Sequence, residues 1–141
     1  MKYAVFQREQ RVRFGHCDPA GIVFYPRYFE MLNELIEDWF ATGLGLPLDE
    51  LIGQRRLGVP TAQLDTRFLR VSRHGDRLMQ RIHLERLGRS SLGLRIAFDG
   101  DDGPRVEFTQ VLVCTSLDTH RPQPFPDDLR AALAAPQEPL P

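Results

Sequence analysis

One long amphipathic segment most constrains the fold of this chain of 141 residues. Between residues 26 and 42, apolar side chains recur at steps of three and four and acidic side chains fall opposite them, which predicts a helix with one apolar stripe. Pro26 suits the first helical position, and we expect Gly43 to be the left-handed residue just past the helix end. A single helix must bury such a stripe, so the rest of the chain has to cover it.

The remainder of the chain is patterned as β-strands. Apolar and polar residues alternate at period two, and we expect strands at residues 5–14, 62–68, 78–85, 92–98 and 105–117, the last of them central in the sheet. Short turns at 72–76, 88–90 and 99–104 predict that consecutive strands pair as antiparallel neighbours. The predicted class is therefore α+β, with a curved antiparallel sheet wrapped around one long central helix and a short C-terminal helix at about 127–135.

The length predicts one domain, over residues 1–135, followed by a flexible tail at 136–141. With 42% hydrophobic and 26% charged residues, the composition is that of a globular protein and excludes the disordered and collagenous classes. Cys17 and Cys114 are too few for a disulfide framework, and we interpret both as free thiols. The chain begins without the apolar core of a signal peptide, and no run approaches the ~20 apolar residues of a membrane span, so we expect a cytoplasmic protein without a membrane partner.

Charge is distributed unevenly although the net charge is only −1. Residues 55–95 contain ten arginines against three acidic residues, a local excess of seven positive charges. Such a segment can form a phosphate site, because guanidinium groups match phosphate oxygens at two points. Alternatively, the arginines of this segment reflect only the composition of the whole chain, since all but one of the 18 basic residues are arginine. The aromatic residues do not interleave with these arginines, which argues against nucleic-acid binding.

Residues 14–29, FGHCDPAGIVFYPRYF, place a polar cluster directly before the predicted helix. A helix N-terminus presents backbone N–H groups without partners and the positive end of the helix dipole. Asp18 lies a few residues upstream, Pro19 stiffens the turn, and Gly15 and Gly21 are expected to permit close backbone approach. A carboxylate beside an oxyanion site suits acyl transfer.

This stretch resembles the hot-dog-fold acyl-CoA thioesterases, in particular the 4-hydroxybenzoyl-CoA thioesterase branch. The resemblance is dense over residues 11–40 and is carried by Asp18, Pro19, Ala20, Gly21, Ile22, Val23, Tyr25, Pro26 and Tyr28. It implies a hot-dog fold and hydrolysis of an acyl-CoA thioester, with an aromatic acyl group. It also implies that Asp18 acts as nucleophile or general base and that the Tyr25 N–H polarises the carbonyl. Gly21 and Val23 would then contact the substrate, and neither a metal nor a cofactor would be needed.

The resemblance further implies a homodimer, or a dimer of dimers, in which each active site lies between two subunits. In this branch a run of basic residues before the fourth strand holds the nucleotide end of CoA. Here the corresponding residues are Arg86, Arg89, Ser90 and Ser91, and Leu87 and Gly88 interrupt the run.

Several alternatives remain open on the sequence alone. Asp18 can be a turn-forming residue before proline, and Glu30 or Glu34 on the helix can be the catalytic carboxylate instead. A Cys17 nucleophile with His16 as its base is disfavoured because adjacent side chains in an extended loop point apart, and His16 with Asp18 lacks a third metal ligand. For the whole protein, the alternatives are a non-catalytic module that binds CoA esters or nucleic acid, and a thioesterase for short aliphatic acyl groups.

Overall fold

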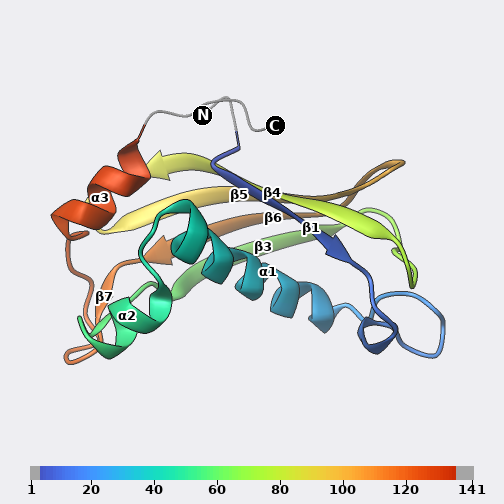
Figure 1. The fold of residues 1–141 in the computed structure, drawn as a ribbon, viewed down its shortest axis with the longest axis horizontal. Helices are drawn as coiled ribbons and strands as arrows, with labels where there is room; N and C mark the ends of the chain where they lie inside the picture. The colour runs from blue at the N-terminus through green and yellow to red at the C-terminus, as the bar shows by residue number, and fades with distance from the viewer. Residues whose placement is uncertain (1–3, 136–141) are drawn as a thin grey trace.

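The computed structural model describes residues 4–135, and the predicted tail at 136–141 lies outside them. In chain order the elements are β1 (Phe6–Arg11), a 3₁₀ turn (Phe14–His16), α1 (Pro26–Asp38), a π-helical turn (Trp39–Gly43), α2 (Leu48–Gly53), β2 (Leu57–Gly58), β3 (Thr61–Phe68), β4 (Arg77–Leu87), β5 (Ser91–Gly100), β6 (Gly103–Val113), β7 (Thr115–Ser116) and α3 (Asp127–Ala134). The five long strands form one curved antiparallel sheet around α1, which confirms the predicted α+β architecture (Figure 1).

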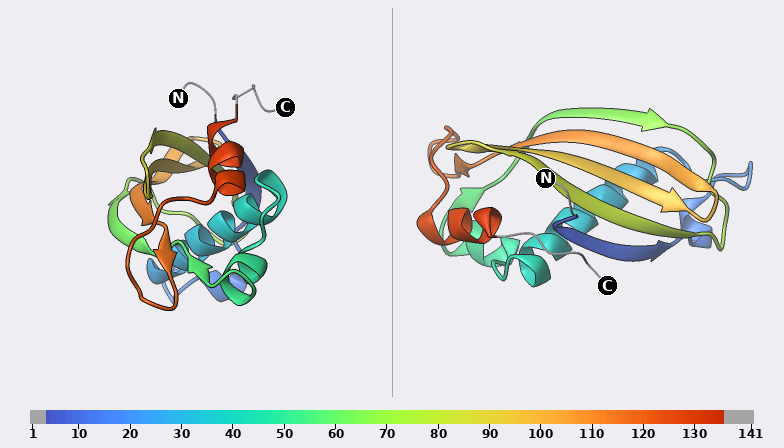
Figure 2. Two further views of the ribbon diagram at one scale, coloured as in Figure 1. Left: turned by 90° about the vertical axis from the view of Figure 1, so that its left-hand side faces the viewer. Right: turned by 90° about the horizontal axis from the view of Figure 1, so that it is seen from above.

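The helix α1 lies along the concave face of the sheet (Figure 2). Its stripe is buried as predicted, with Leu35 fully covered and Trp39 and Phe40 extending the apolar face into the π-helical turn. The prediction for Gly43 is wrong: it lies in that turn without a left-handed conformation, and Gly45 has the positive φ of +71° instead. Gly43 is needed for space, because a Cβ there would stand 2.7 Å from Cδ1 of Trp39.

Alternate residues of the sheet face α1 and form the other half of the core. The inward positions of β4, β5 and β6 are almost fully buried, and Phe98 packs edge to face on Phe108 with ring centroids 5.0 Å apart. Burying each such side chain contributes roughly 1.5–3 kcal/mol. The buried apolar set on these strands is Leu78, Ile82, Leu84, Leu92, Leu94, Ile96, Phe98, Val106, Phe108 and Leu112.

The order of the strands differs from the predicted one. The sheet runs β1-β4-β5-β6-β3, so β3 pairs with β6 and lies at an edge, three positions away from β4. The turn at 72–76 belongs to a longer crossing segment, residues 69–76, which we call the crossing loop. Its eight residues can span up to about 26 Å, whereas three strand spacings amount to only about 14 Å. The connection was therefore long enough to pass two strands.

The predicted strand at 105–117 is also divided. β6 ends at Val113, and β7 turns away to pair with β2 in a separate two-stranded sheet. β6 is an interior strand, but β5 occupies the middle of the large sheet. Among residues 4–135, no helix combines the length and the apolar composition that crossing a membrane requires.

Candidate active site

Residues 17–23 form a tight hairpin before α1, and Asp18 opens its turn. The Asp18 N–H donates to the Ile22 carbonyl at 3.0 Å, and the Gly21 N–H donates to the Asp18 carbonyl at 2.9 Å. Gly21 has a φ of +80°, which a residue with a side chain adopts only under strain. Nothing beyond their chain neighbours lies within 4 Å of a Cβ built at Gly15 or Gly21, so the space beside both residues is open in this chain, and the close backbone approach expected there stays a prediction.

The Asp18 side chain is half-buried, and one of its two carboxylate oxygens accepts a hydrogen bond within the hairpin. Its Oδ1 accepts the Ala20 N–H at 2.8 Å, so the turn-forming role considered above is present. No arginine, lysine or histidine within residues 4–135 forms an ion pair with this carboxylate. The second oxygen, Oδ2, receives no hydrogen bond from this part of the chain, and it is available for chemistry.

The start of α1 leaves one backbone donor unused. Tyr25 already has helical dihedral angles, with φ −53° and ψ −35°, and Pro26 has no N–H. The next two donors are satisfied locally, because the Arg27 N–H donates to the Phe24 carbonyl at 2.9 Å and the Tyr28 N–H donates to the Tyr25 carbonyl at 3.1 Å. The Tyr25 N–H has no acceptor in the described chain, and it stands at the positive end of the helix dipole.

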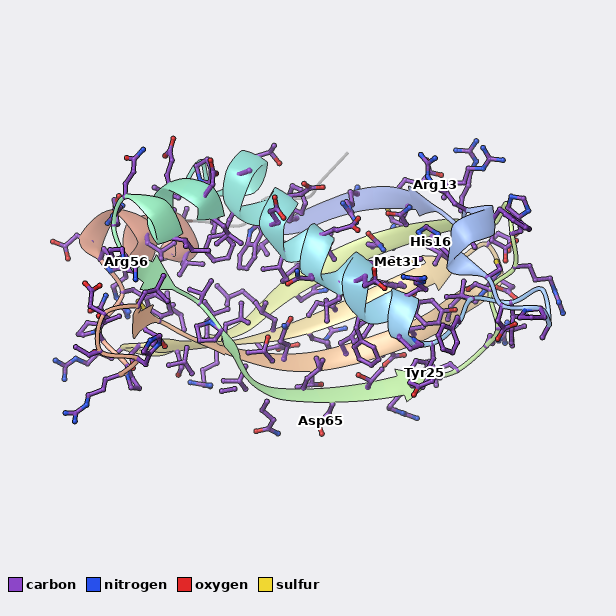
Figure 3. The ribbon with its side chains drawn as sticks, turned by 90° about the horizontal axis from the view of Figure 1, so that it is seen from below. Arg13, His16, Tyr25, Met31, Arg56 and Asp65 are labelled. Carbon is purple, nitrogen blue, oxygen red and sulfur yellow. The ribbon has the colours of Figure 1, made fainter. Side chains whose placement is uncertain are left out.

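A mostly apolar cavity of about 260 Å³ opens beside Tyr25. The hairpin and α1 form one wall, and the end of β3 with the crossing loop forms the other. Phe68 meets Tyr25 edge to face, with ring centroids 6.2 Å apart, and lies 6.0 Å from the Tyr28 ring. Figure 3 shows Tyr25 beside the end of β3, with Arg13 and His16 on the other side of α1. The lining residues are Ile22, Val23, Tyr25, Tyr28, Phe68, Leu69, Arg70 and Val71.

Val23 lines the cavity, whereas Asp18 and Gly21 belong to the same hairpin but do not line the cavity within one chain. The predicted substrate contacts of Val23 and Gly21 stay a prediction. The wall from Phe68 to Val71 was missed by the sequence reasoning. Its exposed apolar side chains, Phe68, Leu69 and Val71, are 51%, 39% and 50% accessible, which is unusual for three neighbouring apolar residues. The sequence signal was present, because a predicted strand ends on the large apolar Phe68 and two more apolar residues, Leu69 and Val71, follow it.

The two glutamates considered as alternative catalysts face away from the cavity. Glu30 pairs with Arg27 at 2.7 Å, and Glu34 lies 3.7 Å from Arg8. Both line a separate hollow of about 310 Å³ together with His16, on the opposite side of α1 from Tyr25. Neither carboxylate is placed at the aromatic cavity by this chain.

His16 and Cys17 do not form a nucleophile and base. The Nδ1 atom of His16 accepts the Arg13 N–H at 2.9 Å, and the Cys17 thiol faces the Arg13 carbonyl at 3.7 Å. Burial lowers the pKa of His16, which favours its neutral form. Within residues 4–135, no three or more His, Cys, Asp or Glu side chains converge in an arrangement that could hold a metal ion.

The residues predicted to hold CoA phosphates lie at the far end of the molecule. Arg86, Arg89, Ser90 and Ser91 surround the turn between β4 and β5, beside α3 (Figure 1). The Arg89 carbonyl accepts the Phe125 N–H at 3.0 Å, which ties this turn to the segment before α3. β4 begins beside the hairpin and runs for 11 residues, so roughly 30 Å separate the two ends. A single chain does not bring these residues to the cavity.

The sequence profile of the thioesterase-like superfamily matches residues 12–133. The chain is 33% identical over 132 residues to a 1,4-dihydroxy-2-naphthoyl-CoA hydrolase of Thermosynechococcus vestitus, covering 92% of this chain and 90% of the relative. It is 32% identical over 70 residues to a 4-hydroxybenzoyl-CoA thioesterase of a Pseudomonas species, covering 48% of this chain and 49% of that protein. Among solved structures, a gentisyl-coenzyme A thioesterase superposes with a TM-score of 0.79 at 28% identity, covering 89% of this chain and 99% of the other.

Proposed function

This chain belongs to the thioesterase-like superfamily as an acyl-CoA thioesterase, and on that basis we propose that it hydrolyses aromatic acyl-CoA esters with Asp18 as its carboxylate. The observation that carries the proposal is the unpaired Tyr25 N–H, which stands at the start of α1 beside an aromatic cavity and only seven residues after Asp18. Attack on a thioester carbonyl requires a carboxylate, a donor for the developing negative charge and a place for the acyl group. Asp18, the Tyr25 N–H and the cavity would supply them.

Tyr25 would act through its backbone. When a nucleophile adds to the thioester carbonyl carbon, negative charge develops on the carbonyl oxygen. An N–H aimed at that oxygen, supported by the roughly half positive charge of a helix N-terminus, stabilises the charge more in the transition state than in the substrate. Because no atom of the described chain occupies this donor, it needs no rearrangement before the reaction.

Asp18 would act in one of two ways, both of which end in free acid and CoA. As a general base, its free Oδ2 takes a proton from water, the resulting hydroxide adds to the carbonyl, and the CoA thiolate leaves and receives the proton. As a nucleophile, the carboxylate itself adds, the thiolate leaves, and water hydrolyses the mixed anhydride. The Asp18 contact with Ala20 uses only Oδ1, which is compatible with either route.

The cavity supports an aromatic acyl group. Its walls hold the rings of Tyr25, Tyr28 and Phe68, and edge-to-face packing of the kind already present there extends naturally to a substrate ring. A cavity of about 150 Å³ can hold benzene, so 260 Å³ accommodates one ring or two fused rings. The named relatives act on dihydroxynaphthoyl and hydroxybenzoyl esters.

We expect a thiol-release assay over a panel of CoA esters to detect hydrolysis and to favour the aromatic ones. The panel comprises hydroxybenzoyl-, dihydroxynaphthoyl-, benzoyl-, butyryl- and acetyl-CoA. Acetyl-CoA lacks the apolar contacts of a ring, so its kcat/KM should be at least about tenfold lower than that of the best aromatic ester. A preference for butyryl-CoA would indicate an aliphatic thioesterase. Tight binding of the esters without thiol release would indicate a binding module and contradict the proposal.

A second copy of the chain would complete the site. β3 is an edge strand with mostly exposed residues, whereas the opposite edge, β1, packs against the end of α1 through the Arg8–Asp38 ion pair at 2.6 Å. Pairing of two β3 edges around a twofold axis would cover the exposed Phe68. The same axis would bring the Arg86 end of one subunit toward the cavity of the other. We therefore propose a homodimer, or a dimer of dimers, in which the predicted CoA contacts are made across subunits.

Sedimentation should give a mass of at least twice the 16.2 kDa of the chain. Phe68→Asp should shift the protein toward the monomer, because a charge would be desolvated at the edge contact. Ile52→Asp is the matched control: Ile52 is 43% exposed on α2, and its replacement should leave the mass unchanged. A wild-type protein that sediments as a single chain at high concentration would contradict the proposed assembly.

We also propose a cytoplasmic location, in agreement with the sequence prediction. Cys17 and Cys114 are both free, and burial raises the pKa of the Cys114 thiol to about 11, which keeps it protonated and unreactive. A reducing compartment suits this thiol state.

A further inference from the structure

We propose that Arg105 is a positioning residue of the active site, which fixes the crossing loop against the hairpin that carries Asp18. This inference rests on the proposed hydrolytic function, but it concerns a residue that does not line the aromatic cavity and takes no part in the steps above. Arg105 lies near the start of β6, at the end of the sheet that the crossing loop passes.

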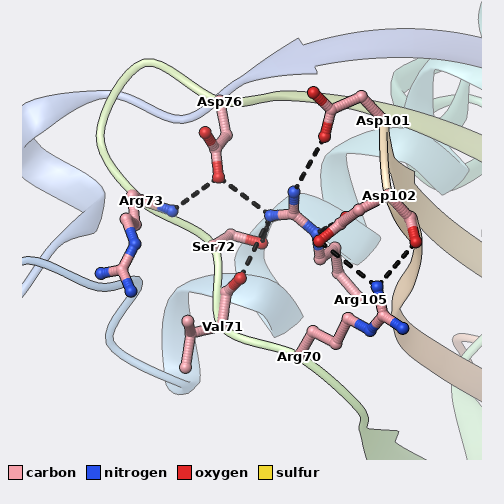
Figure 4. A network of polar contacts seen from close by, with 8 residues as sticks. All are labelled: Arg70, Val71, Ser72, Arg73, Asp76, Asp101, Asp102 and Arg105. Carbon is pink, nitrogen blue, oxygen red and sulfur yellow. Dashed lines mark hydrogen bonds and ion pairs between the residues drawn. The ribbon is translucent and has the colours of Figure 1, made fainter.

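Arg105 is the only buried charged side chain in the described part of the protein, with 6% of its surface exposed. A buried guanidinium is strongly destabilising unless it is paired. Here carboxylates surround it (Figure 4): Nε donates to Oδ1 of Asp102 at 2.7 Å, Nη1 to Oδ2 of Asp76 at 2.9 Å, and Nη2 to Oδ1 of Asp101 at 3.5 Å. The Arg73 backbone N–H and the Arg105 guanidinium both lower the pKa of Asp76 and keep it ionised.

The same residue holds the crossing loop at its beginning, middle and end. The Leu69 N–H donates to the Arg105 carbonyl at 2.8 Å. Nη1 donates to the Val71 carbonyl and to the Ser72 Oγ, each at 3.1 Å, and the contact with Asp76 secures the last residue of the loop. Because a guanidinium offers several donors in a rigid plane, the Arg105 side chain fixes the middle and the end of a segment that belongs to no strand.

The crossing loop in turn holds the hairpin. The Ser72 carbonyl accepts the Val23 N–H at 2.9 Å, and Ile22 and Arg73 form an isolated antiparallel bridge. Tyr25 follows Val23 by only two residues. A shift of the loop therefore moves the hairpin, the start of α1 and the cavity wall relative to one another. A displacement of about 1 Å at reacting groups can reduce a rate about 10²-fold.

The Arg105 guanidinium lies against Gly100 and occupies the space that a side chain at residue 100 would fill. A Cβ added there would stand 2.5 Å from Cζ and 2.5 Å from Nη2 of Arg105, closer than atoms approach without movement. Gly100 does not have a positive φ, so alanine is compatible with its backbone. Gly100→Ala therefore displaces the Arg105 side chain without removing its charge.

The test compares Arg105→Met and Gly100→Ala with the wild type and with Arg95→Met. Arg95 forms an exposed ion pair with Glu85 on the same sheet, and it controls for the loss of a charge. We expect both test variants to lower kcat on the order of 10- to 100-fold with little change in KM, and Arg95→Met to leave both unchanged. Arg105→Lys should recover only part of kcat, because an ammonium group cannot reproduce the planar set of contacts.

Hydrogen exchange adds a readout that does not depend on activity. The Val23 amide should exchange faster in both test variants, while amides shared between β4 and β5 keep their protection. The Arg105→Met protein should fold, since the three aspartates it leaves behind are 34%, 98% and 50% exposed and remain hydrated. If Arg105→Met nevertheless fails to fold, the kcat and the Val23 exchange of Gly100→Ala decide whether Arg105 has the positioning role.

Each result has a distinct meaning. A wild type that hydrolyses acyl-CoA esters, together with unchanged kcat in Gly100→Ala and in folded Arg105→Met, overturns the positioning role and leaves the proposed function intact. A wild type that releases no thiol from any ester overturns the proposed function. Exchange at Val23 then decides the role of Arg105: unchanged exchange overturns it, and faster exchange confined to the hairpin and crossing loop supports it.

Discussion

Asp18→Asn is expected to lower kcat for the best acyl-CoA ester about 10²- to 10⁴-fold, the range for loss of a positioned acid–base group. Asparagine keeps an oxygen that can accept the Ala20 N–H, so the hairpin should retain its shape. The amide can neither attack the thioester nor take a proton from water at neutral pH. Steady-state thiol release and a thermal unfolding curve, recorded on the same preparation, check both parts of the prediction.

Asp49→Asn is the matched control, because Asp49 is an exposed aspartate in the first turn of α2. It should behave as the wild type in both measurements. A rate near that of the wild type in Asp18→Asn would remove Asp18 from the mechanism. Glu30→Gln and Glu34→Gln would then identify the carboxylate, although the ion pairs of these residues with Arg27 and Arg8 argue against them.

The features that the sequence predicted well are local in the chain. The helix from Pro26 was recognisable because the residues of one stripe lie within a few turns of each other, and proline marks its first position. The turn at Asp18 directly before the helix was recognisable for the same reason, since its turn-forming residues and the helix start are only a few positions apart in the chain. The unpaired Tyr25 N–H is likewise a property of a helix terminus and needs no tertiary contact, whereas its polarising role stays a proposal.

The features that were missed depend on contacts between distant residues. The edge position of β3 follows from the length of the crossing loop and from competition among strands for partners, and neither can be read from alternation alone. Arg105 is one of 17 arginines, a residue type that is normally exposed, so nothing in its own segment marks it as buried. The aspartates at 101 and 102 and the nearby Gly100 were interpreted only as a turn.

The role of the Tyr25 N–H can be tested by substitution because of two coincidences in its geometry. Its φ of −53° lies within the range that proline adopts, and its N–H forms no hydrogen bond in the described chain. Tyr25→Pro therefore deletes the donor without breaking a backbone hydrogen bond of the described chain. The variant also loses the aromatic ring at the cavity, so the correct reference is Tyr25→Ala, which loses the ring and keeps the donor.

Relative to Tyr25→Ala, Tyr25→Pro should lower kcat about 10²- to 10³-fold, as the loss of one oxyanion donor does elsewhere. KM should change little between the two variants, because the donor is needed where charge develops and not in the bound ester. The unfolding temperatures should also agree, since neither variant removes a backbone hydrogen bond that the other retains. Equal kcat values for the two proteins would mean that the start of α1 does not stabilise the oxyanion, and that the carbonyl oxygen is bound by a different donor.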